Sequence, residues 1–322
     1  MKAIRFEKTG GPEVLQWVDV DLPPPGPGQV RVRHSAVGVN FIDTYHRSGL
    51  YKLPLPSGLG SEAAGVVEVL GEGVTALKVG DRVGYAGAIG AYSEANNVLA
   101  EKLIKLPGDV SDETAAAALL KGMTAQYLLL RVYPVKRGET IVLHSAAGGV
   151  GLIAGQWAKH LGAHVIGTVG SDEKVALAKG HGCEHVLNLS TGDWPKRVRE
   201  ITKGEGVPVV FDSIGKDTWS GSLDCLAVRG MMVSFGNSSG AVPPFEVSTL
   251  AAKGSLYVTR PTLASFTRNA TELQATADDL FAVIESGAVK IQINQRFKLQ
   301  DAAKAHEALH SRQTTGATVL LP

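Results

Sequence analysis

The segment His144-Ser145-Ala146-Ala147-Gly148-Gly149-Val150-Gly151 carries the clearest chemical signal in the sequence. It follows an apolar, strand-like stretch and opens a helical pattern, which is the context that a dinucleotide-binding loop requires. Small residues let the backbone approach a pyrophosphate, and the helix N-terminus offers it free N–H groups and a positive dipole end. The first glycine of the usual G-x-G-x-x-G pattern is Ala146 here. We predict that Ala146, Gly148, Gly149, Val150 and Gly151 bind a nicotinamide dinucleotide, and a merely tight strand–helix turn is the alternative.

A second feature bears on which dinucleotide the loop prefers. NAD sites usually place Asp or Glu about 20 residues further on, where the carboxylate bonds the ribose 2′-hydroxyl. Here the next strand ends in Thr168-Val169-Gly170-Ser171, and Lys174 follows within one helical turn. Small residues leave room for a 2′-phosphate, and the ammonium can pair with it. The pattern favours NADP(H), although Asp172 and Glu173 are candidate NAD readers, and a solvated helix charge is the alternative interpretation of Lys174.

Composition is ordinary for a globular protein and excludes few classes. The chain has 322 residues, of which 44% are hydrophobic and 20% charged, so two domains are expected. A formal net charge of +1 gives no sign of a nucleic-acid partner. The N-terminus predicts no signal peptide and no window predicts a membrane span. Two cysteines, Cys183 and Cys225, are too few for a disulfide framework, and they indicate free thiols in a reducing cytoplasm.

The texture of the sequence changes along the chain. Residues up to about 110 predict short strands separated by glycine and proline turns, as in an irregular antiparallel barrel. A helix is predicted from Ser111, which is its N-cap, to Val132. From Thr140 apolar strands alternate with helices, which indicates an α/β fold with a parallel sheet covered on both faces. After about residue 264 a helix, a strand, a helix and a last strand follow.

Several segments, taken together, resemble the zeta-crystallin-like quinone oxidoreductases of the medium-chain dehydrogenase/reductase superfamily. They occur in the family's order and extend over essentially the whole chain. The segments that carry the resemblance are GGPEVL, GVNFIDTYHRSGLY, PSGLGSEAAG, GDRV, KGMTAQYLL, HSAAGGVGLIAGQWAK, GTVGSDEK, SFGNSSG and SRQTTGATVLLP.

The resemblance implies a doubly wound Rossmann domain inserted in a GroES-like, mainly-β domain, with the active cleft between them. The domains would be 1–123 and 265–322 for the GroES-like catalytic part and 124–264 for the Rossmann part. It implies catalytic or substrate-lining roles for Asn40, Asp43, Tyr45 and Tyr51. Besides the loop, it implies cofactor contacts for Phe41, Thr124, Tyr127, Gly170, Ser171, Lys174, Ser213, Phe235, Gly236, Asn237, Ser238, Ser239, Arg260 and Arg312.

Two departures from relatives shape the expected chemistry. Relatives often carry tyrosine where this chain has Leu189, which weakens the preference for NADP(H). Zinc-dependent relatives carry cysteine in the segment that matches Gly38 to Asp43 and histidine where this chain has Ser61. We therefore expect no zinc and no other metal, and without a Lewis acid the acceptor must be electrophilic in its own right. Quinones and conjugated enones qualify, and Tyr45 and Tyr51 are candidates to stack on a flat ring, or are ordinary packing residues.

Three other motif matches indicate different chemistry. His306-Glu307-Ala308-Leu309-His310 reads H-E-x-x-H, a zinc-protease pattern, but no downstream third ligand follows. The G-x-S-x-G match at Gly236 to Gly240 requires a helix directly after it, which Pro243 and Pro244 disfavour. His181 to His185 is rich in metal-binding residue types, but its spacing matches no standard zinc pattern. We interpret all three as structural.

The leading hypothesis is an NADPH:quinone reductase acting by hydride transfer. A reductase of conjugated alkenes on the same scaffold is the first alternative, and a non-catalytic crystallin-like or RNA-binding protein is the second. The resemblance implies a homodimer. The strand-like segment Gly254 to Pro261 is a candidate pairing edge, and we expect charges at Leu256 and Val258 to produce a monomer.

Overall fold

The computed structural model describes all residues from Met1 to Pro322, and the chain divides into two compact units. The first comprises Met1–Met123, Phe266–Phe281 and Ile291–Pro322, and the second comprises Thr124–Ser265 and Ala282–Lys290. Residues 282–290, which follow the expected domain boundary, therefore group with the second unit. None of the helices combines the length and the apolar character needed to cross a bilayer.

The first unit is built on strands whose burial alternates. Strand β3 (Gln29–Val39) buries Val30, Val32, His34 and Ala36 and turns the intervening residues outward, because successive side chains of a strand point to opposite faces. The sheet order is β15-β16-β3-β5-β6-β8, with β7 also paired to β3, and a second sheet has the order β2-β1-β4. The other strands are β1 (Lys2–Phe6), β2 (Gln16–Asp19), β4 (Ser57–Gly58), β5 (Glu62–Leu70), β6 (Arg82–Ala86), β7 (Ala95–Leu99), β8 (Ile104–Lys105), β15 (Ile293–Lys298) and β16 (Ala317–Leu321).

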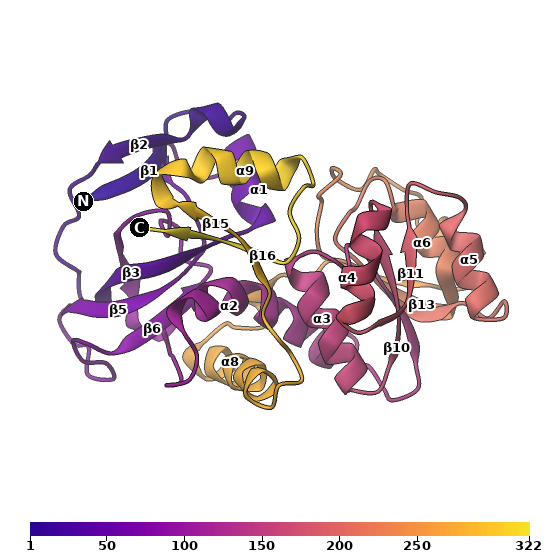
Figure 1. The fold of residues 1–322 in the computed structure, drawn as a ribbon. Helices are drawn as coiled ribbons and strands as arrows, with labels where there is room; N and C mark the ends of the chain where they lie inside the picture. The colour runs from indigo at the N-terminus through magenta and orange to yellow at the C-terminus, as the bar shows by residue number, and fades with distance from the viewer. The chain divides into compact units, whose positions relative to one another are not determined.

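The chain's end is part of the first sheet. Strand β16 pairs antiparallel with β3, where Thr318 lies opposite Val39, and β15 pairs parallel with β16. The indigo and yellow segments accordingly lie side by side in Figure 1. Helices α1 (Phe41–Ser48) and α9 (Ala302–His310) also belong to this unit, with the short turns η1 (Pro12–Val14), η2 (Ala100–Lys102) and η6 (Leu299–Asp301).

The second unit is a parallel sheet with the order β11-β10-β9-β12-β13-β14. Every pairing in it is parallel. Because chain order runs outward in both directions from β9, the sheet is doubly wound, as predicted, and its order reverses between β9 and β12. The strands are β9 (Thr140–Leu143), β10 (His164–Val169), β11 (Cys183–Asn188), β12 (Val207–Asp212), β13 (Leu226–Ser234) and β14 (Tyr257–Thr259).

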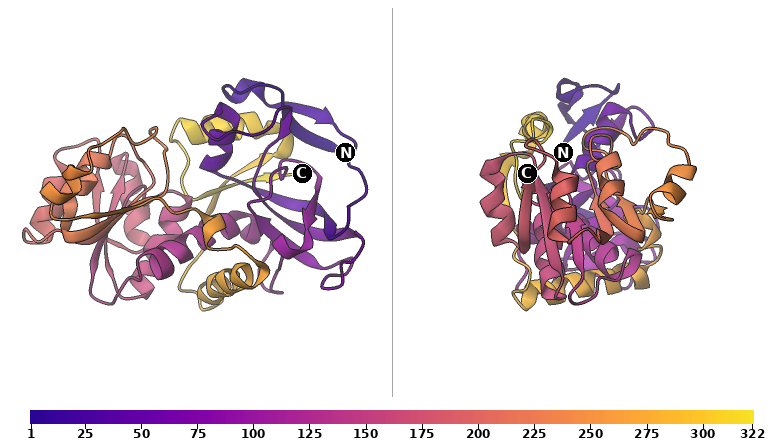
Figure 2. Two further views of the ribbon diagram at one scale, coloured as in Figure 1. Left: turned by 180° about the vertical axis from the view of Figure 1, so that it is seen from behind. Right: turned by 90° about the vertical axis from the view of Figure 1, so that its right-hand side faces the viewer.

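Helices cover both faces of this sheet, with α3 and α4 on one side and α5 and α6 on the other (Figures 1 and 2). The core between them is rich in β-branched residues such as Val142, Ile166 and Val210, all fully buried. The helices are α3 (Gly149–His160), α4 (Val175–Gly180), α5 (Trp194–Ile201), α6 (Trp219–Cys225) and α7 (Ser248–Ala252), with turns η4 (Asp172–Lys174) and η5 (Leu263–Ser265). Helices α2 (Asp112–Gln126) and α8 (Ala270–Glu285) each contribute to both units.

Two local features differ from the sequence-based expectations. The helix from Ser111 does not continue regularly to Val132, because Tyr127–Val132 forms a π-helical turn, a form that often occurs at functional sites. Helix α1 was not among the predicted elements. Its signals are in the sequence, since Asp43 accepts from the backbone N–H of the N-cap residue Asn40 and Gly49 ends the helix with a φ of 84°.

Candidate active site

The dinucleotide loop has the backbone geometry that a pyrophosphate requires. Gly148 is the N-cap of α3, so the helix begins inside the glycine segment and its first-turn amides have no intrahelical acceptor. A Cβ on Gly151 would lie 2.2 Å from the carbonyl oxygen of Ser145. Only glycine therefore lets the helix start this close to the strand, and the loop fits a pyrophosphate bound at the helix N-terminus.

The sequence-predicted cofactor residues of the second unit gather at one edge of its sheet. Each group directly follows the carboxyl end of a parallel strand, which is where ligands bind in open α/β sheets. The groups are 144–151 after β9, Gly170 and Ser171 after β10, Ser213 after β12, 235–239 after β13 and Arg260 after β14. The fold thus brings this part of the predicted set together, although which side chains touch a cofactor stays a prediction.

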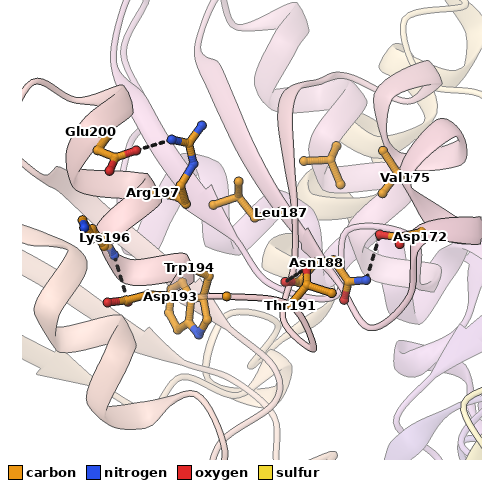
Figure 3. Close-up of a pocket in the computed structure, with 12 residues that line it drawn as sticks. Asp172, Val175, Leu187, Asn188, Thr191, Asp193, Trp194, Lys196, Arg197 and Glu200 are labelled. Atoms are coloured by element: carbon orange, nitrogen blue, oxygen red, sulfur yellow. Dashed lines mark hydrogen bonds and ion pairs between the residues drawn. The ribbon is translucent and has the colours of Figure 1, made fainter.

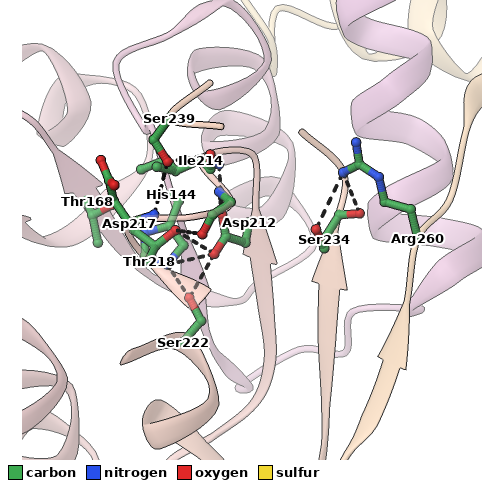
Figure 4. A network of polar contacts seen from close by, with 11 residues as sticks. His144, Thr168, Asp212, Ile214, Asp217, Thr218, Ser222, Ser234, Ser239 and Arg260 are labelled. Atoms are coloured by element: carbon green, nitrogen blue, oxygen red, sulfur yellow. Dashed lines mark hydrogen bonds and ion pairs between the residues drawn. The ribbon is translucent and has the colours of Figure 1, made fainter. Parts of the chain in front are cut away.

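A buried hydrogen-bond network holds His144, the first residue of the dinucleotide loop (Figure 4). His144 Nδ1 lies 2.7 Å from Thr168 Oγ1, and its Nε2 lies 2.9 Å from Ser222 Oγ. Ser222 and Thr218 both donate to Asp212 Oδ2, at 2.9 and 2.7 Å. Burial lowers the pKa of His144, which favours a neutral ring that joins β10 to α6 by hydrogen bonding just after β9 ends. Sequence reasoning did not single out this network, because only the fold brings its members together.

Figure 4 also draws side chains that follow β12, β13 and β14, among them Ile214, Ser239 and Arg260. Ser239 Oγ donates to the carbonyl of Ile214 at 2.9 Å, and a Cβ on Gly236 would lie 2.4 Å from the carbonyl oxygen of Ser213. Arg260 Nη1 donates to the carbonyls of Ser234 and Gly236, at 2.9 and 3.2 Å. The guanidinium therefore holds the 234–236 backbone, which is a positioning role for the predicted cofactor residue Arg260.

The predicted adenosine side is formed by the ends of β10 and β11. Gly170 has open space around the position of a Cβ, as a nearby ribose requires. Asp172 Oδ1 accepts from Asn188 Nδ2 at 2.9 Å, so this candidate NAD reader is bonded within the protein. Lys174 is partly buried in the turn η4 and its amide donates to Ser171 O at 3.2 Å. Leu189 lies beside β10, its amide bonded to Val169 O at 2.8 Å.

A pocket of about 550 Å³ lies next to this region (Figure 3). Val175, Val186 and Leu187 supply apolar walls, and both signs of charge line the rest. Arg197 pairs with Glu200 on α5, so the pocket offers no excess of cations to an anionic ligand. We assign it no role.

The linking helix contributes two predicted cofactor residues. Tyr127, on the π turn, is 3% exposed, and Thr124 is 7% exposed. A hydrogen bond joins their side chains, and burial raises the pKa of the Tyr127 phenol. Tyr127, the first residue of the π turn, is therefore in direct contact with Thr124, and both residues belong to the second unit.

In the first unit, the predicted substrate residues cluster on and after α1. The rings of Tyr45 and Tyr51 meet edge to face with centroids 5.3 Å apart, and Phe41 lies 6.4 Å from Tyr45. The amide of Tyr51 donates to the carbonyl of Tyr45 at 3.0 Å. Tyr45 is 9% exposed and Tyr51 is more accessible. Arg312 is exposed in the turn that follows α9.

Asp43 is fully buried and both of its oxygens accept hydrogen bonds. Oδ1 accepts from Ser61 Oγ at 3.1 Å, and Oδ2 accepts from the Asn40 amide at 2.9 Å and from Tyr92 OH at 3.0 Å. Burial raises the pKa of Asp43 to about 7, against the lowering effect of these donors. A side chain with no exposed surface acts on a substrate only through its neighbours, so the geometry gives Asp43 a positioning role.

Asn40 and Ser61 each donate a hydrogen bond to a buried carboxylate, Asn40 to Glu62 and Ser61 to Asp43. Asn40 Nδ2 donates to Glu62 Oε2 at 2.8 Å. The same oxygen accepts from Lys121 Nζ at 2.9 Å, and Glu62 Oε1 accepts from the Leu120 amide at 2.7 Å. Both carboxylate oxygens of Glu62 thus accept hydrogen bonds from the protein. The structure contains no group of three or more His, Cys, Asp or Glu side chains that could hold a metal ion.

Comparisons with known proteins find relatives that match the chain over its full length. The chain matches the family models described as alcohol dehydrogenase GroES-like domain (residues 26–135) and zinc-binding dehydrogenase (residues 149–281). A quinone oxidoreductase of Pseudomonas aeruginosa is 57% identical over 100% of this chain and 99% of its own. The chain belongs to the quinone oxidoreductase family of the medium-chain dehydrogenase/reductases.

Other members of the quinone oxidoreductase family are similarly close. The crystal structure of Escherichia coli quinone oxidoreductase complexed with NADPH has a TM-score of 0.99 and 51% identity, with 100% of both chains covered. A 2-haloacrylate reductase of a Burkholderia species is 48% identical over 98% of each chain. The predicted family and fold class, a Rossmann sheet with a GroES-like domain, are confirmed.

The three other motif matches, at His306 to His310, Gly236 to Gly240 and His181 to His185, do not have the surroundings that their chemistry would need. His306 is fully buried and bonded to Arg47 and Tyr92, whereas His310 is exposed at the end of α9. No helix follows Gly240 before α7 begins at Ser248. Cys183 is buried in β11, and His181 bonds the carbonyl of Leu177 at 2.8 Å.

One sequence-based expectation needs correction. Leu256 is 6% exposed and packs in the core of the second unit, and Val258 packs against that core. Charges at these positions would disrupt the core and would not report on subunit pairing. Strand β14 is the last strand of the sheet, and its outward residue is Tyr257, which is 58% exposed. Strand alternation, with Tyr257 between two inward neighbours, is the signal that separates these residues.

Proposed function

We propose that this protein reduces quinones with NADPH and without a catalytic zinc ion. The observation that carries the proposal is the full-length identity of 51–57% to named quinone oxidoreductases. The glycine loop supports it, since the fit of Gly151 against Ser145 is the cradle that a pyrophosphate needs. Carboxylates engaged by Ser61, Asn40 and Lys121 support an acceptor that is electrophilic without metal activation.

The residues of the second unit would bind the cofactor. The first-turn amides of α3 would hold the pyrophosphate, with His144 keeping the loop in place through Thr168 and Ser222. Ser171 and Lys174 would lie at the 2′-phosphate. When bound, NADPH supplies a hydride, and the protein contributes orientation.

The residues on α1 would bind the acceptor. The edge-to-face arrangement of Tyr45 and Tyr51 leaves aromatic surface for a flat ring, and Tyr51 is the more accessible of the two. Asn40 is held by Glu62, so its amide orientation is set before a ligand binds. Preset side chains place an acceptor at lower entropic cost than mobile ones.

The test is cofactor oxidation with a simple quinone, comparing NADPH with NADH and with a metal chelator present throughout. We expect turnover that the chelator does not reduce and that prefers NADPH. Replacement of Lys174 by alanine should raise the KM for NADPH about tenfold or more, because a charge-assisted hydrogen bond is lost. Lys179→Ala, which removes an exposed lysine on α4, is the matched control. Activity only with NADH would contradict the assignment at Lys174.

A second acceptor class is favoured by one observation, the 48% identity to a 2-haloacrylate reductase. Haloacrylates are conjugated alkenes, which accept a hydride at carbon without a metal ion. Parallel assays with a quinone and with a 2-haloacrylate would rank the two by kcat/KM. A higher kcat/KM for the alkene would replace quinone as the main acceptor.

We also propose a homodimer in the cytoplasm. The edge strand β14, with Tyr257 58% exposed, supports pairing with a second copy. Cys183 and Cys225 are free and buried, which is typical of proteins in reducing compartments.

A further inference from the structure

Four buried side chains form a hydrogen-bond chain that leaves α1 at Arg47 and returns to the same helix at Asp43, by way of His306 on α9 and Tyr92. Arg47 Nη1 lies 3.0 Å from His306 Nδ1, and His306 Nε2 lies 3.0 Å from Tyr92 OH. Tyr92 OH donates to Asp43 Oδ2 at 3.0 Å. All four residues are between 0% and 4% exposed, so water does not compete for these hydrogen bonds.

The hydrogens of this chain have one consistent direction. A guanidinium only donates, so His306 Nδ1 accepts from Arg47, and the ring's single proton lies on Nε2. That N–H donates to the Tyr92 oxygen, which leaves the hydroxyl hydrogen for Asp43. Burial and the charge of Arg47 lower the pKa of His306 to about 3, so the ring stays neutral in this arrangement.

Asp43 connects the chain to the acceptor residues. As the third residue of α1 it accepts from the Asn40 amide, which fixes the helix start. Tyr45 lies half a turn further along and holds the Tyr51 backbone. Asp43 is thus hydrogen-bonded to Asn40 and lies on the same short helix as Tyr45.

We propose that Arg47, His306 and Tyr92 are positioning residues: they hold Asp43 as an ionised hydrogen-bond acceptor and thereby fix the first turn of α1. This role rests on the proposed quinone reductase function and concerns its acceptor end.

The proposal implies a pH dependence centred on Asp43. Its neighbours come from every element packed against it. They are Asn40 at the N-cap of α1, Arg47 from α1, Ser61 just before β5, Glu62 at its start, Tyr92 from the loop before β7, Lys121 from α2 and, through Tyr92, His306 from α9. The Tyr92 hydrogen bond lowers the pKa of Asp43, so its removal should move that pKa above about 7.

The direct test compares Tyr92→Phe with Tyr85→Phe. Tyr85 is a matched control, because it is also fully buried and bonded to a histidine, His34 Nε2 at 3.0 Å, without touching Asp43. Chemical unfolding at pH 5 and pH 8.5 measures the stability lost by each variant. The folded-state pKa of Asp43 lies above its unfolded value, so its contribution to stability is lost as pH rises through the folded pKa.

We expect the stability loss of Tyr92→Phe to be larger at pH 8.5 than at pH 5, and that of Tyr85→Phe to be the same at both. Equal losses of Tyr92→Phe at the two pH values would overturn the proposal. This readout does not involve catalysis, so it stays decisive even if the protein proves to have no quinone reductase activity.

The second readout is the pH profile of kcat/KM for quinone reduction. Tyr92→Phe should shift the midpoint upward by about one unit, the size expected for a lost hydrogen bond to a charged group. An unchanged midpoint would overturn the connection to the acceptor site. His306→Leu should shift it in the same direction, and His306→Gln should restore it, because glutamine offers one acceptor to Arg47 and one donor to Tyr92.

Discussion

Glu62 and Lys121 form a salt bridge of 2.9 Å, with side chains 0% and 6% exposed. Asn40 shares the Glu62 oxygen, so the pair connects β5 and α2 to the residue that caps α1. Removing one partner of a buried pair leaves an uncompensated charge, which costs about 3–5 kcal/mol. We expect Lys121→Met to lower the free energy of unfolding by about that amount in urea titrations.

The second half of that experiment restores the balance. Lys121→Met combined with Glu62→Gln removes both charges and should recover a large part of the lost stability. Lys2→Ala, which breaks an exposed pair with Asp19, should cost at most about 1 kcal/mol. If Lys121→Met lowered the free energy of unfolding no more than Lys2→Ala does, the buried Glu62 charge would not depend on Lys121 for its compensation.

A methyl group at Gly151 should disrupt the dinucleotide loop. The added Cβ would lie 2.2 Å from Ser145 O and 2.8 Å from the Ala146 backbone, which leaves it no room. We expect Gly151→Ala to weaken NADPH binding about tenfold or more, measured by fluorescence titration, with about 1–3 kcal/mol lost from stability. Gly180→Ala, where nothing lies near the added atom, should bind NADPH normally.

Buried neutral histidines should make the protein sensitive to acid. Burial lowers the pKa of His34 to about 4, from an ordinary value of 6.5. For a base with a lowered folded-state pKa, stability is lost as pH falls from 6.5 toward 4, by about 3 kcal/mol in total. His34→Gln should remove that part of the decrease between pH 7 and pH 4, as followed by urea unfolding. His310→Gln, on the exposed end of α9, should leave the decrease as in the wild type.

The proposed dimer should depend on Tyr257. This side chain points outward from the edge strand β14, so a charge there should oppose strand pairing without entering the core. We expect Tyr257→Asp to halve the mass in multi-angle light scattering while its thermal unfolding stays close to that of the wild type. Val79→Asp, at another exposed apolar residue, is the control. A dimer that persists in Tyr257→Asp would assign the contact to a different surface.

Much of the second unit follows from local sequence patterns. The apolar strand before His144, the glycines and the helix that starts at Gly149 are contiguous, and each obeys a short-range rule. Repeated strand–helix alternation then restricts the topology to a parallel sheet, because βαβ crossovers share one hand. The carboxyl ends of the strands consequently meet at one edge of the sheet, because all of its pairings are parallel.

Helix α1 shows a limit of such patterns. The sequence contains ordinary capping signals for this helix at Asn40, Asp43 and Gly49. The helix has only eight residues, however, and it lies between segments that predict strands, so these signals did not lead to a predicted helix. The inward orientation of Leu256, the residue before the three-residue strand β14, was not predicted, because in so short a strand the alternation is clear only once its exposed residue, Tyr257, is known.

The sequence by itself determined the family, the doubly wound sheet and the place of the dinucleotide loop, because these depend on neighbours within a few residues. The tertiary structure decided the environment of Asp43. Its partner Tyr92 is 49 residues away, and His306 is 214 residues beyond Tyr92. No periodicity or spacing connects residues so far apart, and only the packing of α9 against the barrel turns an apparent metal motif into a buried hydrogen-bond chain.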